Sequence, residues 1–94
     1  MTRGPAVPRY IIEREVGSIT LEELHAAGRK SNEVLDEMKG VVWIRSYVSD
    51  VEGKIYCEYD APSPEAVMEH ARRSGIPANR ISEISMEINP DMFR

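Results

Sequence analysis

The chain is poor in the residues from which disulfides, metal cages and phosphate loops are built. Its 94 residues include one cysteine and two histidines, so an internal disulfide is excluded and neither Cys-x-x-Cys nor His-x-x-x-His occurs. Its glycines are isolated and show no phosphate-binding fingerprint. A complete metal cage within one chain is therefore not expected.

Long apolar runs and clustered basic residues are also missing. No apolar stretch approaches the roughly 20 residues that a membrane-spanning helix needs. The net charge is -4 and the basic residues are scattered, which argues against nucleic acid as a partner. Residues 1–8 lack the apolar segment of a signal peptide. We therefore expect a cytoplasmic protein whose partners include neither membranes nor nucleic acid.

Four stretches of the chain have the β-branched, partly alternating composition of strands. Between the second and third, Gly53 can close a tight hairpin, because glycine readily adopts the positive φ that such turns need. The predicted strands are residues 9–16, 41–49, 54–59 and 80–88.

Two helices are predicted between these strands. Thr20 and Glu23 have the spacing of a capping box, which opens the first helix, and Gly40 ends it. Ser63 is the N-cap of the second helix and Gly75 ends it. The resulting βαββαβ order predicts a ferredoxin-like α+β sandwich, with an antiparallel four-stranded sheet and both helices on one face. The domain spans residues 9–89, between a flexible N-terminal tail (1–8) and a C-terminal tail (90–94).

Side-chain alternation divides each predicted strand between two faces of the sheet. The set expected under the helices is mostly apolar: Ile12, Val42, Ile44, Val48, Ile55, Cys57, Tyr59, Ile84, Met86 and Ile88. The opposite set mixes carboxylates with large aromatics: Ile11, Glu13, Glu15, Trp43, Arg45, Tyr47, Tyr56, Glu58, Glu83 and Glu87.

Three interpretations of this second, aromatic and acidic face stay open. It packs against the same face of a second subunit, lines a cavity, or is an ordinary amphipathic surface. Tyrosine and tryptophan are enriched at interfaces, which favours the first interpretation. We therefore expect a homodimer that forms through the sheet.

Cys57 and His70 are both expected to point into the layer between sheet and helices. A thiolate and an imidazole in contact can ligate a metal or act as nucleophile and base. The alternative is structural: Cys57 is then a small buried hydrophobe and His70 a hydrogen-bonded packing residue. Further metal ligands would have to be a carboxylate, a tyrosine, water or a group from another subunit.

The run from Tyr10 to Ile81 resembles a small bacterial ferredoxin-like family, long filed as a domain of unknown function, whose members are often labelled nickel-binding proteins. The resemblance is carried by residues 12–14, 43–48, 54–59, 61–62, 69–71 and 75–81. It implies a ferredoxin-like fold, a dimer and nickel. Family members often have His where this chain has Arg45, and a guanidinium does not ligate a metal. The positions that carry over are Glu13, Trp43, Tyr47, Tyr56, Cys57, Tyr59 and His70.

These observations predict a small dimeric protein that binds a divalent transition metal, nickel by resemblance, for sequestration or handling. His70 and Cys57 are its predicted metal ligands. The alternative is a dimeric module that binds a small organic ligand, with or without catalysis, at the aromatic and acidic face or in the layer of Cys57 and His70. A structural domain without a small ligand is the third interpretation. A binding protein is favoured over an enzyme, and no catalytic residue is assigned. The predicted ligand-binding residues are Glu13, Trp43, Tyr47, Tyr56 and Tyr59.

Overall fold

The computed structural model describes residues 7–94, so the predicted N-terminal tail lies mostly outside the described residues. Four strands and two helices follow one another in the predicted βαββαβ order, and a short 3-10 helix comes after them. The elements are β1 (Arg9–Glu15), α1 (Leu21–Leu35), β2 (Val42–Ser49), β3 (Lys54–Asp60), α2 (Pro64–Ser74), β4 (Arg80–Ile84) and η1 (Pro90–Phe93).

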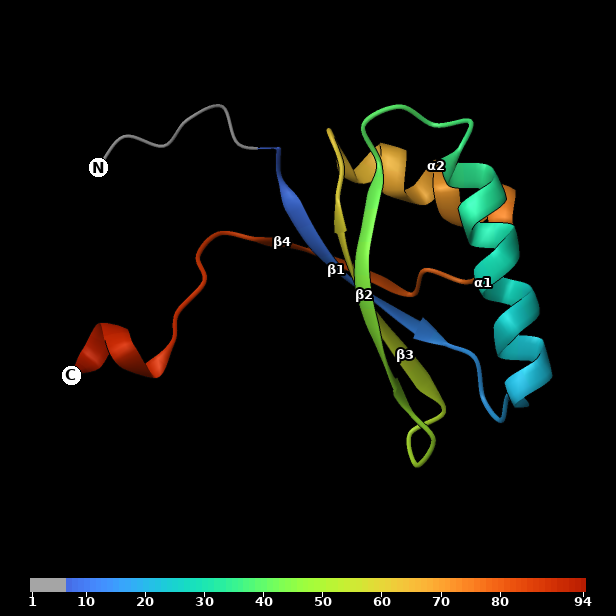
Figure 1. Ribbon diagram of the computed structural model, residues 1–94, viewed down its shortest axis with the longest axis horizontal. Coiled ribbons are helices and arrows are strands. Elements are labelled where there is room, and N and C mark those ends of the chain that lie inside the picture. Colours follow the sequence, from blue (N-terminus) through green and yellow to red (C-terminus); the bar gives the residue numbers. More distant parts are fainter. Residues whose placement is uncertain (1–6) are drawn as a thin grey trace.

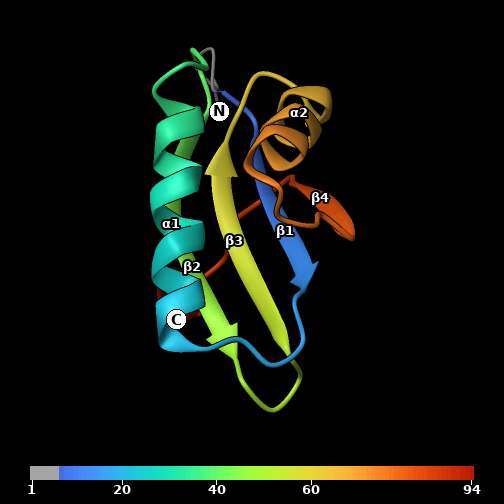
Figure 2. The ribbon, with the colours of Figure 1, turned by 90° about the vertical axis from the view of Figure 1, so that its right-hand side faces the viewer.

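The strands form one antiparallel sheet in the order β2-β3-β1-β4. Both helices lie on the same side of this sheet, α1 alongside β2 and β3 and α2 nearer to β1 and β4 (Figures 1 and 2). The predicted ferredoxin-like α+β fold is thereby confirmed. None of the helices within residues 7–94 is long and apolar enough to cross a membrane.

The helix caps form as their sequence patterns predict. The backbone N–H of Glu23 donates to the Thr20 hydroxyl at 3.0 Å, and the Thr20 N–H donates to the Glu23 carboxylate at 2.9 Å. Ser63 accepts from the N–H of Ala66 at 3.2 Å at the start of α2, and Gly75 ends that helix with a φ of 74°. These local contacts set where each helix begins.

Helix α1 is shorter than predicted, because it ends at Leu35 and not at Gly40. The N–H groups of Glu37 and Met38 bond to carbonyls three residues earlier, and this tighter turn interrupts the helical pattern. Gly40 still has a positive φ of 83° where the chain turns into β2.

A β-bulge in β2 changes which side chains face the helices. The register against β3 shifts between Trp43, which lies opposite Tyr59, and Arg45, which lies opposite Glu58. Ile44 is therefore an extra residue in β2. Before it, at Val42 and Trp43, the side chains lie on the faces opposite to those that strict alternation from the rest of β2 predicts. The prediction that Trp43 lies on the open face was wrong, because its ring stacks on that of Tyr59 on the helix side, with centroids 6.5 Å apart. Val42, predicted under the helices, is 54% exposed instead.

The faces of β4 are reversed relative to the prediction. Ile84 pairs with Arg9 and Ile81 pairs with Ile12, so Ile81 packs against the core and Glu83 does not lie on the open face. The apolar alternation of the C-terminal residues suggested the opposite assignment. That alternation continues into residues that are not part of the sheet.

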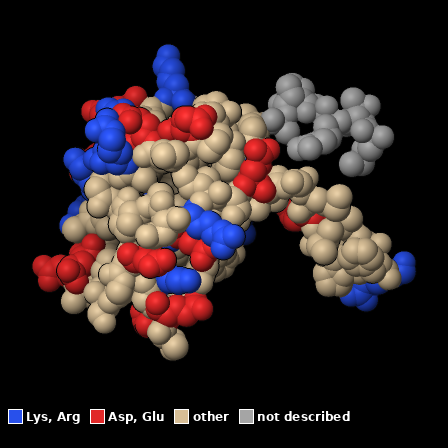
Figure 3. All heavy atoms as spheres, turned by 180° about the vertical axis from the view of Figure 1, so that it is seen from behind, with Lys and Arg blue, Asp and Glu red and all other residues tan. Residues whose placement is uncertain are grey.

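The chain leaves the sheet after Ile84, which pairs with Arg9, the first residue of β1. Beyond this pair, residues 7–94 supply no further strand for the C-terminal residues. Strand β4 was predicted to reach Ile88, with Met86 and Ile88 under the helices. Both are wrong, because these side chains are 74% and 60% exposed. Residues 85–94 form a C-terminal arm that extends from the body of the molecule (Figures 1 and 3).

The core lies between the sheet and the two helices. Ile12 of β1 and Val67 of α2 have no exposed surface, and burial of such side chains contributes about 1.5–3 kcal/mol each. The buried cluster consists of Tyr10, Ile12, Val41, Ile55, Cys57, Tyr59, Ala61 and Val67.

Candidate functional site

A cavity of about 590 Å³ lies between α1, the helix-facing side of the sheet and the loop after α2. This volume is within the range of small-molecule binding sites. Most of its wall is apolar and includes Val16, Leu24, Trp43, Ile55 and Ile76. A few polar or charged side chains interrupt this wall, namely Arg14, Glu15, Ser31, Ser46, Cys57 and Tyr59.

Small residues on α1 keep this space open. Ala27, Gly28 and Ser31 line the cavity from the helix side. A Cβ atom built on Gly28 would lie 3.9 Å from Cη2 of Trp43, which is an ordinary van der Waals contact. A longer side chain at this position would have to occupy the cavity. The volume of the cavity therefore depends on the small side chains of α1.

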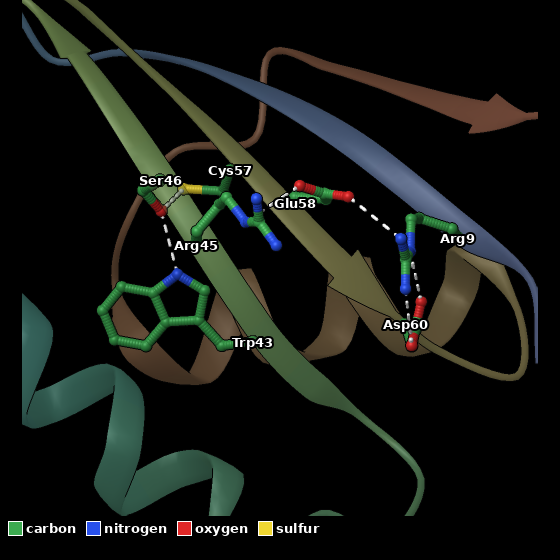
Figure 4. Close-up of polar contacts among 7 residues, drawn as sticks. All are labelled: Arg9, Trp43, Arg45, Ser46, Cys57, Glu58 and Asp60. Atoms are coloured by element: carbon green, nitrogen blue, oxygen red, sulfur yellow. Dashed lines mark hydrogen bonds and ion pairs between the residues drawn. The ribbon is translucent and has the colours of Figure 1, made fainter. Parts of the chain in front are cut away.

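One wall of the cavity carries a chain of hydrogen bonds that ends at Cys57. Nε1 of Trp43 donates to Oγ of Ser46 at 2.9 Å, and that hydroxyl donates to Sγ of Cys57 at 2.9 Å (Figure 4). Nε of Arg14 donates to the same sulfur at 3.2 Å. The sulfur thus accepts two hydrogen bonds, one of them from a cation. A metal ion at this sulfur would have to lie beside the guanidinium of Arg14.

Arg14 is only 2% exposed and is the largest fully buried side chain of the described residues. Besides its bond to Cys57, its Nη1 donates to the carbonyl of Pro77 at 3.1 Å. Its Cζ lies 5.8 Å from the centroid of the Tyr59 ring, a cation–π distance. Its Nη2 is buried and has no hydrogen-bond acceptor. No ion pair found within residues 7–94 includes Arg14.

His70 lies in the same layer and has no exposed surface. Its Nε2 is 3.3 Å from the backbone carbonyl of Ser31 and 3.2 Å from the Ser31 hydroxyl. A carbonyl only accepts, so Nε2 carries the hydrogen and Nδ1 is left as a buried lone pair without a partner. Burial, together with the charge of Arg14, lowers the pKa of His70 below its ordinary value. The imidazole is therefore neutral at pH 7.

Tyr59 lies between the polar groups of this layer. Its hydroxyl is 3.3 Å from Oγ of Ser31, and its ring centroid is 5.3 Å from that of His70. Burial raises the pKa of Tyr59 above its ordinary value, so the phenol is protonated at pH 7. Tyr59 thus connects the half of the layer that holds Arg14 to the half that holds His70.

The structure does not join the two predicted metal ligands by a direct bond. Cys57 is bonded to Ser46 and Arg14, whereas His70 is bonded to Ser31. Within residues 7–94, no group of three or more His, Cys, Asp or Glu side chains could hold a metal ion. The donors among these residues therefore do not by themselves complete a site for a resident nickel ion.

Three of the predicted binding residues lie on the opposite, open face of the sheet. Glu13 is 3.6 Å from Nζ of Lys54, and Tyr47 pairs with Tyr56 across the strands. The hydroxyl of Tyr56 donates to Glu52 at 2.6 Å, which raises the pKa of Tyr56 to about 12. These residues do not join Trp43, Cys57 and Tyr59 at the cavity.

The open face also carries a connected set of ion pairs. Arg9 bonds to Asp60 at 2.9 Å and to Glu58 at 3.2 Å, and Arg45 is 3.5 Å from the other oxygen of Glu58 (Figure 4). Glu58 and Asp60, like Glu13 beside Lys54, are therefore paired with neighbouring cations. Acidic and basic side chains are likewise interspersed over the body in Figure 3.

Three cavity residues were missed at the sequence level: Arg14, Ser31 and Ser46. Arg14 had a usable signal, because it follows the buried Ile12 by two residues and so shares its face. Ser46 had the same kind of signal, because it precedes Val48 by two residues and so shares the face predicted to lie under the helices. Ser31 follows Gly28 by three residues and Leu24 by seven and so shares their face of α1, but its contacts with Tyr59 and His70 have no mark in the sequence.

Residues 10–84 match the sequence model of a family described as nickel responsive protein SCO4226-like. The chain belongs to this family. The crystal structure of SCO4226 from Streptomyces coelicolor A3(2) is similar, with a TM-score of 0.76 and 27% sequence identity. That similarity covers 85% of this chain and 99% of the SCO4226 chain. No match was found among curated proteins. The family and the fold implied by the resemblance are thus confirmed, and the SCO4226-like description refers to a response to nickel.

Proposed function

We propose that the protein is a cytoplasmic binding protein that holds a small organic ligand in the cavity beside Cys57. The observation that carries this proposal is the cavity of about 590 Å³, with apolar walls and a few polar groups gathered near one side. Such a combination is typical of small-molecule sites, where apolar contact supplies affinity and a few polar groups set orientation.

The surroundings of Cys57 offer no nucleophile–base pair. Such a pair needs a base beside the thiol, and the groups bonded to this sulfur are a hydroxyl and a guanidinium. Neither accepts a proton at neutral pH. His70, the predicted base, bonds to Ser31 instead.

A neutral fluorescent probe, N-phenyl-1-naphthylamine, tests this proposal. Trp43 is the only tryptophan and lines the cavity, so a bound probe should quench its emission by energy transfer. We expect saturable quenching with one site per chain. Gly28→Leu should abolish it by filling the cavity, whereas Ala26→Leu, on the exposed side of α1, should leave it intact. No saturable binding, or equal binding by both variants, would contradict the proposal.

A second candidate function is the binding of a divalent transition metal, nickel by the family description. It is favoured by one feature of the site, the buried lone pair of His70 Nδ1, which has no partner. His70 and Cys57 would be the ligands from this chain, and a second subunit or water would supply the rest. Calorimetric titration of metal-free protein with Ni²⁺ tests this candidate. Binding that His70→Ala abolishes supports it, and binding that survives the substitution removes His70 as a ligand.

We further propose that the protein forms a homodimer and that the C-terminal arm takes part in the contact. The arm exposes four large apolar side chains over a short length: Met86, Ile88, Met92 and Phe93. Single exposed apolar residues are common, but a cluster of this kind usually marks an interface.

Light scattering measures the oligomeric state. The double variant Ile88→Asp/Phe93→Asp should halve the measured mass, whereas Met68→Asp, an equally exposed apolar residue on α2, should not. A dimer that survives in the arm variant but is lost in Tyr47→Asp would instead use the open face of the sheet. A monomeric wild-type protein would contradict both arrangements.

A further inference from the structure

Arg14 is a buried cation without an anionic partner in the described part of the chain. Its side chain is 2% exposed, and its nearest polar contacts are a sulfur and a backbone carbonyl. A buried charge costs several kcal/mol unless an opposite charge and further hydrogen bonds compensate it. The buried N–H groups of Nη2 have no acceptor at all. The folded protein thus keeps a costly group that its own residues satisfy only in part.

The position of Arg14 at the cavity connects this uncompensated charge with ligand binding. Arg14 lines the cavity, and its guanidinium is held in place by Cys57 on one side and Pro77 on the other. The one carboxylate among the lining residues, Glu15, is exposed and forms no ion pair with Arg14. The cavity therefore has one fixed positive charge, without an ion-pair partner among the described residues, in a mostly apolar wall.

We infer that the cavity takes an amphipathic organic anion, whose acidic group binds Arg14 and whose apolar body packs against Trp43, Leu24 and Ile55. This inference rests on the proposed binding function and specifies its ligand class. A carboxylate or a similar acidic group is the natural partner of a guanidinium, because charge-assisted hydrogen bonds are about twice as strong as neutral ones. Nη2 is itself buried, so the acidic group reaches it by displacing part of the wall, to which the loop after α2 contributes Gly75, Ile76 and Pro77.

Two dyes that differ by one acidic group test this inference. N-phenyl-1-naphthylamine is neutral, and 8-anilinonaphthalene-1-sulfonate carries a sulfonate on the same aromatic body. Both are titrated into the wild-type protein with Trp43 emission as the readout. We expect the sulfonate to bind about tenfold or more tightly than the neutral dye, the difference that a charge-assisted hydrogen bond supplies.

Arginine variants on the two faces of the sheet show which arginine causes the preference for the sulfonate dye. Arg14→Met removes the charge from the cavity wall and should bring the two dyes to about equal affinity. Arg45→Met removes the same charge from the open face, where the side chain is 59% exposed, and should leave the preference unchanged. Gly28→Leu should abolish binding of both dyes, which separates the cavity from any dye bound on the C-terminal arm.

The outcomes distinguish the inference from the function on which it rests. If the neutral dye binds in the cavity and the sulfonate binds no tighter, the anion inference is wrong and the binding function stands. If the preference survives in Arg14→Met, the inference is also wrong, because the anion is then recognised elsewhere. If neither dye binds in a manner sensitive to Gly28→Leu, both are wrong.

A competition in the wild-type protein keeps the inference testable if Arg14→Met does not fold. Octanoate and octan-1-ol have the same chain length and differ in the charged end group. Octanoate should displace the neutral dye at about one tenth of the concentration that octan-1-ol requires. Equal potency of the two would overturn the inference without the use of any variant.

Discussion

Two arginines of β1, one on each face of the sheet, have different partners. Arg9 and Arg14 are both on β1, five positions apart. Arg9, on the open face, bonds to two carboxylates, Glu58 and Asp60. Arg14, on the helix face, has no carboxylate partner within the described residues and is almost completely buried. The charge of Arg9 is thus paired within the described residues, whereas the charge of Arg14 is not. A ligand site is therefore expected on the helix face.

Neighbouring isoleucines of β1 give the largest contrast between the faces. Ile12→Ala should lower the free energy of unfolding by about 3 kcal/mol, since Ile12 is fully buried in the core. Ile11→Ala, on the open face, should lower it by about 1 kcal/mol. Urea denaturation followed by circular dichroism measures both. Equal losses would mean that the open face is also covered, which a dimer through the sheet would produce.

The pH dependence of stability tests the buried layer around His70. Burial lowers the pKa of His70 below its ordinary value of 6.5, so the unfolded chain binds the proton more tightly than the folded protein does. The contribution of neutral His70 to the free energy of unfolding is present above pH 6.5. It is lost as the pH falls from 6.5 through the lower pKa of the folded protein. The free energy of unfolding should fall by at most about 1.4 kcal/mol per pH unit in this window.

Denaturation curves at several values between pH 7.5 and pH 5 should show this loss in the wild-type protein. His70→Gln cannot titrate in this range and should give a flatter profile. If the two profiles have the same slope, carboxylates and not His70 govern stability in this window.

Removal of the Arg14 charge should change the free energy of unfolding by a smaller amount, and should raise it. Arg14→Met replaces a buried cation by an apolar side chain of similar length. We expect the protein to become more stable by about 1 kcal/mol, because the cost of burying the charge outweighs its hydrogen bonds to Cys57 and Pro77. A clear loss of stability in thermal or urea unfolding would show that Arg14 is mainly a structural residue, and would weaken the case for an anionic ligand.

The smallest change in stability is expected from a substitution on the open face. Arg45→Met removes an exposed partner of Glu58, which keeps its contact with Arg9. Exposed ion pairs contribute little and are screened by salt. The urea midpoint should be nearly unchanged, and any small change should vanish at high ionic strength. A substantial, salt-independent loss would place Arg45 in a buried interface between subunits.

Local patterns in the sequence were reliable guides to the fold. The capping box at Thr20 and Glu23, the N-cap at Ser63 and the glycine after α2 all form as predicted, because each depends on contacts within a few residues. The order of the elements then restricts the sheet to a small number of topologies. Errors began where a side chain's position depended on a neighbouring strand.

The candidate site was predicted in part for the same reason. Cys57 and Tyr59 are on β3, whose alternation is regular, and they face the helices as expected. Trp43 was assigned to the wrong face because one extra residue in β2 reverses the alternation before it. Met86 and Ile88 were placed in the core because they alternate like strand residues, although β1 offers them no partner.

The sequence by itself determined the order of strands and helices, the starts of both helices and the family. These follow from short-range hydrogen bonding and from hydrophobic periodicity, which are encoded locally. The tertiary structure alone decided that Trp43, Ser46, Cys57 and Arg14 share one wall and that the last residues leave the sheet. Such features depend on the register between strands and on the space left between a helix and the sheet. A buried arginine without an anionic partner becomes visible only when its surroundings are known.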